Sequence, residues 1–293
     1  MNRIFFLFSF FIFLNLSAQQ DFQWLKIKKY KVATLSDSLR ETSGLTFMDG
    51  KLYTFNDGGN TSEIFEIDKN SGKILKKYET GLKNFDWEAI TSDSLNFYIG
   101  EFGNNWGTRT DLKIYKIQKN SVSSGTELKF HYPEQQDFSR KPQANNWDAE
   151  SMIFRNGNLH LFTKEWQSYQ TAHYVLQPSA GTEKQNAQKL ENYNLGFLAT
   201  DASYFNGNLY VIGYTKKMEV YLSVFKEDGN GVFFTEKPQK YYLGSTSNLG
   251  QIEGIAVNDD GIYISAEEFR LVIFNADQAL YFVPWKVFEK AGQ

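Results

Sequence analysis

The chain has 293 residues, no cysteine and a formal net charge of −3, and aromatic residues make up 17% of it. Without cysteine the protein has no disulfides and no lipid-modified cysteine near its amino terminus. The weak net charge and the lack of a basic run exclude a nucleic-acid partner from the expected functions. High aromatic content is typical of many short strands packed side by side.

Residues 1–20 have the pattern of a secretory signal peptide. Arg3 gives a positive start, residues 4–14 are almost wholly apolar, and Ala18 marks a small-residue cleavage site. The apolar stretch is too short for a stable membrane span, and no other stretch approaches that length. We therefore expect an exported protein, periplasmic or extracellular, with no membrane span and a single domain over residues 21–293.

The next element, residues 22–35, alternates like a strand but precedes a phrase that recurs five times. We expect this strand to complete the last blade of a closed ring. The clearest copy of the phrase begins at Gln251 and reads as two strands around a turn at residues 259–261. One residue in the second strand of every copy serves as an anchor: Tyr53, Tyr98, His160, Tyr210 and Tyr263.

Successive anchors lie 45, 62, 50 and 53 residues apart. Self-similarity at this spacing indicates a β-propeller, whose four-stranded blades span about 40–50 residues. The expected fold is therefore all-β, a single propeller with five four-stranded blades. A sixth blade would need to be hidden in residues 133–146, which we expect to form a loop. The third strand of the last blade is either residues 271–274 or residues 279–283.

Ten residues before each anchor lies a column of polar residues: Ser43, Glu88, Glu150, Thr200 and Glu253. In a propeller the first strand of each blade lines the channel, so the start of that strand and the end of the second share one mouth. The column should therefore meet the ends of the second strands: Asn56, Asp57, Glu101, Lys164, Glu165, Tyr214, Glu267 and Glu268. Glu41, Asp86 and Asp148 lie two residues before the column.

So many carboxylates at one opening cannot all ionise without a counter-charge. Sites with six to eight oxygen ligands suit Ca²⁺, a hard cation. The pattern therefore favours a divalent cation, most simply Ca²⁺, held by Glu88, Glu150, Glu253, Glu101, Glu267 and Glu268. Two alternatives stay open: the glutamates accept backbone N–H bonds from neighbouring blades, or Lys164 neutralises the cluster without a metal.

Other residues give weaker signals. His160 occupies an anchor position inside a strand, which indicates packing more than catalysis. No Gly-x-Ser-x-Gly phrase supports a serine nucleophile. Four tryptophans near the acidic column would suit an aromatic rim around a ligand: Trp87, Trp106, Trp147 and Trp166.

The repeated phrases resemble those of the SdiA-regulated protein family, whose members are exported or periplasmic β-propellers. The likeness covers all five repeats, and its motifs begin at Glu41, Asp86, Ala149, Thr200 and Glu253. The resemblance implies the fold and the export. It gives no indication of an enzymatic activity.

The phrase Ile-Tyr-Ile-Ser-Ala-Glu-Glu that ends at Glu268 is also similar to the calcium-binding phrase of β-propeller phytases. That likeness implies that Glu253, Glu267 and Glu268 are calcium ligands. The Asp-Asp-Pro-Ala phrase of those phytases is absent, and only Lys164 and Arg270 match their phosphate-binding cations.

The sequence thus predicts a monomeric binding module for a small molecule or protein, with Ca²⁺ at one mouth of its channel. The alternative is a calcium-dependent hydrolase of phosphate esters or lactones at the same mouth. In that case Glu150 or Glu267 would act as base, and Lys164 would stabilise the oxyanion.

Overall fold

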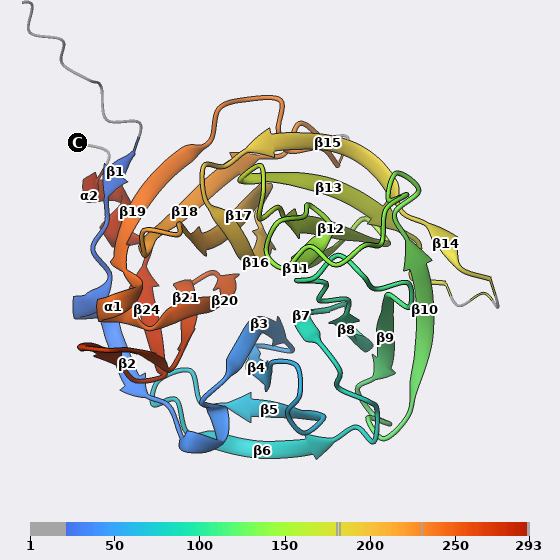
Figure 1. The fold of residues 1–293 in the computed structure, drawn as a ribbon. Coiled ribbons are helices and arrows are strands. Elements are labelled where there is room, and N and C mark those ends of the chain that lie inside the picture. The colour runs from blue at the N-terminus through green and yellow to red at the C-terminus, as the bar shows by residue number, and fades with distance from the viewer. Residues whose placement is uncertain (1–21, 180, 182, 230, 292–293) are drawn as a thin grey trace, which may run out of the picture.

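The computed structural model describes residues 22–179, 181, 183–229 and 231–291, so the predicted signal peptide lies outside the described residues. Five antiparallel sheets surround a central channel (Figure 1). The innermost strand of each sheet contacts the innermost strand of the next, which closes the ring. The five-bladed propeller is confirmed. Among the described residues, no helix has the length and apolar character needed to cross a membrane.

Each of the first three blades is a run of four strands in chain order from the channel outward. Blade one holds β3 (Thr42–Met48), β4 (Lys51–Asn56), β5 (Glu63–Ile67) and β6 (Ile74–Glu79). Blade two holds β7 (Trp87–Ser92), β8 (Asn96–Glu101), β9 (Lys113–Gln118) and β10 (Gly125–His131). Blade three holds β11 (Asp148–Arg155), β12 (Asn158–Lys164), β13 (Gln170–Leu176) and β15 (Gln188–Asn194). The short strand β14 (Gln185–Asn186) extends blade two in parallel with β10.

The last two blades share the amino-terminal segment. Blade four holds β16 (Leu198–Phe205), β17 (Asn208–Tyr214), β18 (Glu219–Lys226) and β19 (Gln239–Ser245), with β1 (Gln23–Trp24) added in parallel. Blade five holds β20 (Gln251–Asn258), β21 (Gly261–Glu267), β24 (Ala279–Pro284) and the outermost β2 (Lys31–Thr34). Because β2 pairs antiparallel with β24, the expected closure by the first strand is confirmed.

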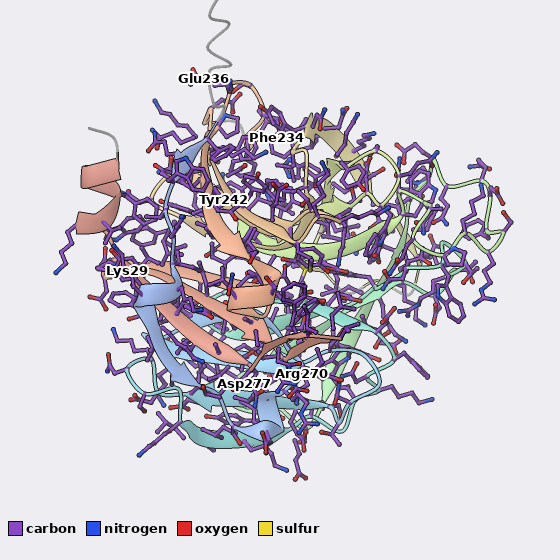
Figure 2. All side chains as sticks on the ribbon, turned by 60° about the vertical axis from the view of Figure 1, so that its left-hand side comes forward. Lys29, Phe234, Glu236, Tyr242, Arg270 and Asp277 are labelled. Atoms are coloured by element: carbon purple, nitrogen blue, oxygen red, sulfur yellow. The ribbon has the colours of Figure 1, made fainter. Side chains whose placement is uncertain are left out.

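The third strand of blade five is therefore β24, the second of the two predicted segments. Residues 271–274 instead belong to a separate hairpin of β22 (Phe269–Leu271) and β23 (Phe274–Ala276). Arg270 and Asp277, both labelled in Figure 2, form an ion pair in this hairpin, with Nη2 of Arg270 2.7 Å from Oδ1 of Asp277. The described residues also include four short helices: η1 (Lys28–Tyr30), η2 (Asp37–Leu39), α1 (Thr246–Leu249) and α2 (Lys286–Ala291).

The amino-terminal segment fastens two blades to each other. The N–H groups of Leu25 and Ile27 donate to blade four, at Tyr242 and Leu243, before the chain crosses to blade five. Leu25 and Ile27 are buried, whereas Trp24 is half exposed. The segment also holds four lysines between positions 26 and 31, so the chain does contain a short basic run.

The recurring anchors pack between neighbouring blades. Tyr53 lies edge-on to Phe97 with ring centres 4.9 Å apart, and Tyr98 stacks on Phe154 at 5.5 Å. Burying a large apolar side chain contributes about 1.5–3 kcal/mol. This packing between blades is the physical reason for the period that is visible in the sequence.

The turns between first and second strands follow from residues that tolerate positive φ. Asn156-Gly157 has φ values of 50° and 78°, and Asn206-Gly207 has 46° and 77°. Positive φ at both central residues defines the type I′ turn, which matches the twist of paired strands.

Candidate metal centre

Every innermost strand carries a one-residue bulge near its start, and these bulges create the site. A bulge leaves one residue unpaired and re-aims its side chain. The bulged residues are Gly44, Glu88, Glu150, Thr200 and Glu253. Four of these five residues belong to the polar column identified in the sequence. In blade one the bulge falls on Gly44, with φ of 72°, and Ser43 stays paired with Phe55.

The bulges bring carboxylates from several blades to one mouth of the channel. Glu88, Glu150, Glu253 and Glu267 are all buried. Burial raises the pKa of Glu88 well above its ordinary value, and the charges of Asp57 and Glu150 raise it further. The convergence expected from the repeat register is therefore present, and its carboxylates fall into two groups.

The first group is the acid triad, Asp57, Asp86 and Glu88. Asp57 directly follows β4, Asp86 directly precedes β7, and Glu88 is the bulged residue of β7. One carboxylate oxygen from each residue can be chosen so that all three lie within 4.8 Å of one another. Two adjacent blades thus direct three oxygen ligands towards one point.

No protein cation pairs directly with the triad among the described residues, and Lys164 and Arg109 only lower the pKa of Asp57 and Asp86, respectively, from a distance. Glu88 is only 4% exposed, yet among the described residues its carboxylate has no hydrogen-bond or ion-pair partner. The carboxylate of Asp86 has none in that part of the chain either, and Asp57 accepts one bond from the N–H of Gly58. A buried carboxylate without a partner is costly unless it takes up a proton or a cation.

Two glycines make room for these carboxylates. A Cβ atom at Gly103 would overlap the carboxylate oxygens of both Glu88 and Asp86. A Cβ atom at Gly58 would lie 2.7 Å from Oδ1 of Asp86. Any side chain at either position would displace the carboxylates, so the backbone forms a close cradle around them.

Burial changes how the triad titrates. It raises the pKa of Asp86 to about 7, assisted by the charges of Asp57 and Asp148. It raises the pKa of Asp57 to about 6, although the N–H of Gly58 opposes the shift. Near neutral pH a cation can therefore replace protons that the folded protein would otherwise hold.

The second group is the lysine network, in which Lys164 supplies a positive charge. Its Nζ lies 2.5 Å from both carboxylate oxygens of Glu150 and donates to the hydroxyl of Tyr214 at 3.3 Å. Tyr214 donates to Glu253 at 3.4 Å. Gln251 donates to Glu253 at 2.6 Å and to Glu267 at 3.2 Å.

Lys164 is protonated in this network. Burial alone would lower its pKa, but Glu150, followed by Tyr214 and Glu253, raises it well above the ordinary value. Burial raises the pKa of Glu150 while Lys164 lowers it. We assign the shared proton to Lys164 because its ammonium contacts both carboxylate oxygens. Neutralisation by Lys164, one of the two alternatives to a metal, therefore applies to this half of the mouth.

The other alternative was that the glutamates bond backbone N–H groups of neighbouring blades; in the structure such inter-blade bonds are made by Thr200 and Asp201 of blade four instead. The hydroxyl of Thr200 donates to the carbonyl of Ile252 at 2.8 Å. Asp201 accepts from the N–H groups of Ile255 at 2.7 Å and Leu45 at 3.3 Å. One buried carboxylate thus ties blades one, four and five together.

Glu101, a predicted metal ligand, lies behind the triad and is fully buried. Its carboxylate accepts from the N–H groups of Phe85 at 2.9 Å and Asp86 at 3.2 Å, and pairs with Arg109 at 2.9 Å. Glu101 therefore holds the backbone that positions Asp86.

Glu268, another predicted ligand, lies outside the channel. It pairs with Arg270 at 2.6 Å and with Arg40 at 3.7 Å. Of the six predicted ligands, the structure places Glu88 in the triad and Glu150, Glu253 and Glu267 in the lysine network. Sequence reasoning located Asp57 and Asp86 at this mouth but left them out of the ligand set, although each lies next to a strand end.

Of the four tryptophans expected to form an aromatic rim, one is exposed. Trp87 and Trp166 are buried and Trp147 is half buried, whereas Trp106 is 53% exposed. His160 is buried, and its Nδ1 lies 2.8 Å from Nε2 of His173. Burial lowers the pKa of His160 to about 4, so this anchor is neutral at physiological pH.

No family model and no curated protein matches this chain. Among solved structures, one similar chain belongs to hydrazine synthase from Kuenenia stuttgartiensis, with 9% sequence identity and a TM-score of 0.42. The match covers 86% of this chain and 68% of that chain.

Proposed function

We propose that this protein is an exported binding module that holds a divalent cation, Ca²⁺, at the acid triad. The observation that carries the proposal is Glu88, a buried carboxylate without a protein partner beside Asp57 and Asp86. Three carboxylates leave part of the six to eight coordination positions of Ca²⁺ for water or for an external ligand.

The chemistry of the donors favours a hard cation such as Ca²⁺ over Zn²⁺ or Cu²⁺. The triad offers only carboxylate oxygens, whereas imidazole and thiolate ligands favour Zn²⁺ or Cu²⁺. Extracellular modules commonly bind Ca²⁺ with a Kd of about 10⁻⁴–10⁻³ M. Export by the predicted signal peptide would bring the chain to a compartment where such an affinity is useful.

The test is thermal unfolding with excess Ca²⁺ and with a chelator. A ligand that binds only the folded state stabilises it by about 2.7 kcal/mol at a hundredfold excess over its Kd. We expect this rise in the native protein and its loss in Glu88→Gln, while the control Glu268→Gln retains it. An unchanged Tm, together with no metal by elemental analysis, would reject the proposal.

The hydrolase alternative requires Lys164 to face a substrate. Its ammonium instead contacts Glu150 and Tyr214 and lies 4.8 Å from the ring centre of Trp166. The same contacts engage Glu150, the candidate base. Since no specific observation favours hydrolysis, binding is the function that we propose.

A further inference from the structure

A cleft of about 330 Å³ opens on blade two beside the acid triad. Phe85, Asp86, Trp106 and Arg109 are among the residues that line it. Asp86 belongs to both the cleft and the triad. A molecule in the cleft would therefore lie next to a cation held by the triad, and could supply oxygen ligands to it.

The cleft presents a fixed aromatic surface. Phe85 is 60% exposed and Trp106 is 53% exposed, which is unusual for side chains of this size. The carbonyl of Trp106 accepts from the N–H of Lys141 at 2.8 Å, and the carbonyl of Gly107 accepts from Gln135 at 2.9 Å. The backbone that carries the indole is thus held in place before any ligand binds.

One face of the indole is already covered. The guanidinium of Arg140 lies 4.2 Å from the ring centre of Trp106, and Arg140 is not among the residues that line the cleft. Trp106 still lines the cleft and is 53% exposed, so part of its surface stays open to a ligand. An aromatic face carries partial negative charge, which attracts the partly positive C–H groups of a ligand.

The polar groups of the cleft favour a neutral ligand. Arg109 is engaged by Glu101 at 2.9 Å and Asp111 at 3.0 Å, so its charge is neutralised within the protein. The side chains of Asn105 and Thr108 line the cleft and, within the described residues, make no hydrogen bond. An amide and a hydroxyl are thus available beside the carboxylate of Asp86. Two cations lie nearby, Lys83 over the ring of Phe85 and Arg140 over the ring of Trp106, but neither lines the cleft.

We propose that this cleft binds a neutral saccharide. The apolar C–H face of the sugar ring would stack on Trp106, and its hydroxyls would bond Asn105 and Thr108. Neighbouring hydroxyls would complete the coordination of the cation beside Asp86. This last contact rests on the proposed calcium site, whereas the stacking on Trp106 does not. The surrounding carboxylates of the mouth disfavour an anionic ligand.

The test is binding of the full-length mature protein to an array of neutral glycans, with Ca²⁺ and with a chelator, followed by calorimetry on the glycans retained. We expect Ca²⁺-dependent binding that weakens about tenfold in Trp106→Ala, from the loss of stacking, and largely survives in Trp106→Phe. Trp24→Ala serves as the control, because Trp24 is similarly exposed but belongs to the amino-terminal segment. The rise in Tm caused by Ca²⁺ should be unchanged in Trp106→Ala.

Three results would overturn the saccharide proposal. The first is that the Ca²⁺-loaded protein retains no neutral glycan on the array, and the second is that the retained glycans bind Trp106→Ala as tightly as the native protein. The third is that the protein prefers inositol hexakisphosphate to neutral sugars. Binding that needs Trp106 but survives the chelator would support the cleft and reject the metal bridge. A Ca²⁺ effect on Tm without glycan binding would instead support the calcium site and reject the cleft.

Discussion

Glu88 and Glu150 occupy the same bulged position in neighbouring blades and are equally buried, yet their surroundings differ. Glu150 is paired with Lys164, the residue opposite Asp148 at the end of the hairpin. The equivalent residue of blade two, four places after its anchor, is Phe102, whose ring packs in the core with its centre 6.1 Å from that of Phe130. Blade two therefore supplies no ammonium where blade three supplies Lys164.

This difference separates structural carboxylates from those of the proposed site. The repeat places a carboxylate at the mouth in several blades, and in blade three Lys164, four places after the anchor, pairs with it. In the lysine network the protein therefore provides the neutralisation. In the acid triad no cation of the described residues pairs directly, so a proton or an external cation can provide it.

The largest effect should come from removing the cation of the lysine network. Lys164→Met would leave Glu150 buried without a counter-charge, which typically costs about 3–5 kcal/mol of unfolding free energy. Urea denaturation measures this loss. Adding Glu150→Leu to the same chain should recover part of it, because the uncompensated charge is then gone. A loss below about 1 kcal/mol in the single variant would contradict the assigned pairing.

The next effect concerns the pH dependence of the triad. The folded pKa values of Asp86, about 7, and Asp57, about 6, lie above the ordinary value of 3.8, so the folded state binds more protons than the unfolded state. Their contribution to stability is therefore present below about pH 4 and is lost as pH rises through 6 to 7. Melting temperatures across this range, with chelator, should fall as pH rises. Saturating Ca²⁺ should reduce the fall, and identical curves with and without Ca²⁺ would contradict the proposed site.

A smaller effect is expected from replacing the bulged glutamate by glutamine, which should change the unfolding free energy in opposite directions in the acid triad and in the lysine network. Glu88→Gln removes a charge that has no protein partner, so without metal the unfolding free energy should stay unchanged or rise by about 1 kcal/mol. Glu150→Gln is the matched control. It removes the carboxylate that pairs with the buried ammonium of Lys164, so it should destabilise the fold. Urea denaturation in chelator compares them. Equal losses in both variants would remove the distinction between the two groups.

The smallest effect is expected at Glu268, which the sequence assigned to the metal. Its pairs with Arg40 and Arg270 are at the surface, and such pairs contribute about 0–1 kcal/mol. Glu268→Gln should leave both the unfolding free energy and the Ca²⁺ effect on Tm within that margin. A loss of the Ca²⁺ effect in this variant would move the site away from the triad.

The fold was largely predictable. Each blade needs a large residue such as Tyr98 at the same position to pack on the next blade, so these residues recur in the sequence at the spacing of the blades. The period did not reveal the bulges, nor that the bulged residue of blade one is Gly44 and not Ser43, because a shift of one residue does not change the period. The third strand of blade five was ambiguous because residues 271–274 are as apolar as a strand but form the tip of an exposed hairpin.

The candidate site was predictable only as a region. The repeat register brings carboxylates to one mouth, but it does not encode their partners. Glu101 is engaged by Arg109, which lies in the loop after β8, and strand periodicity says nothing about that loop. Asp57 and Asp86 lie just outside the strands, where the repeat pattern ends.

The pairing of β2 with β24 also has a consequence for the order of folding. Residues 31–34 are synthesised before the first four blades, whereas the strand they pair with, residues 279–284, is made after them. Blade five therefore cannot form until the other four blades have been made, and until then the edge of the amino-terminal strand is unpaired. Pairings so distant in sequence slow folding, because the entropy of closing the loop is lost before the contacts form. We expect a late, slow step in refolding, in which β2 pairs with β24 and closes the ring of blades.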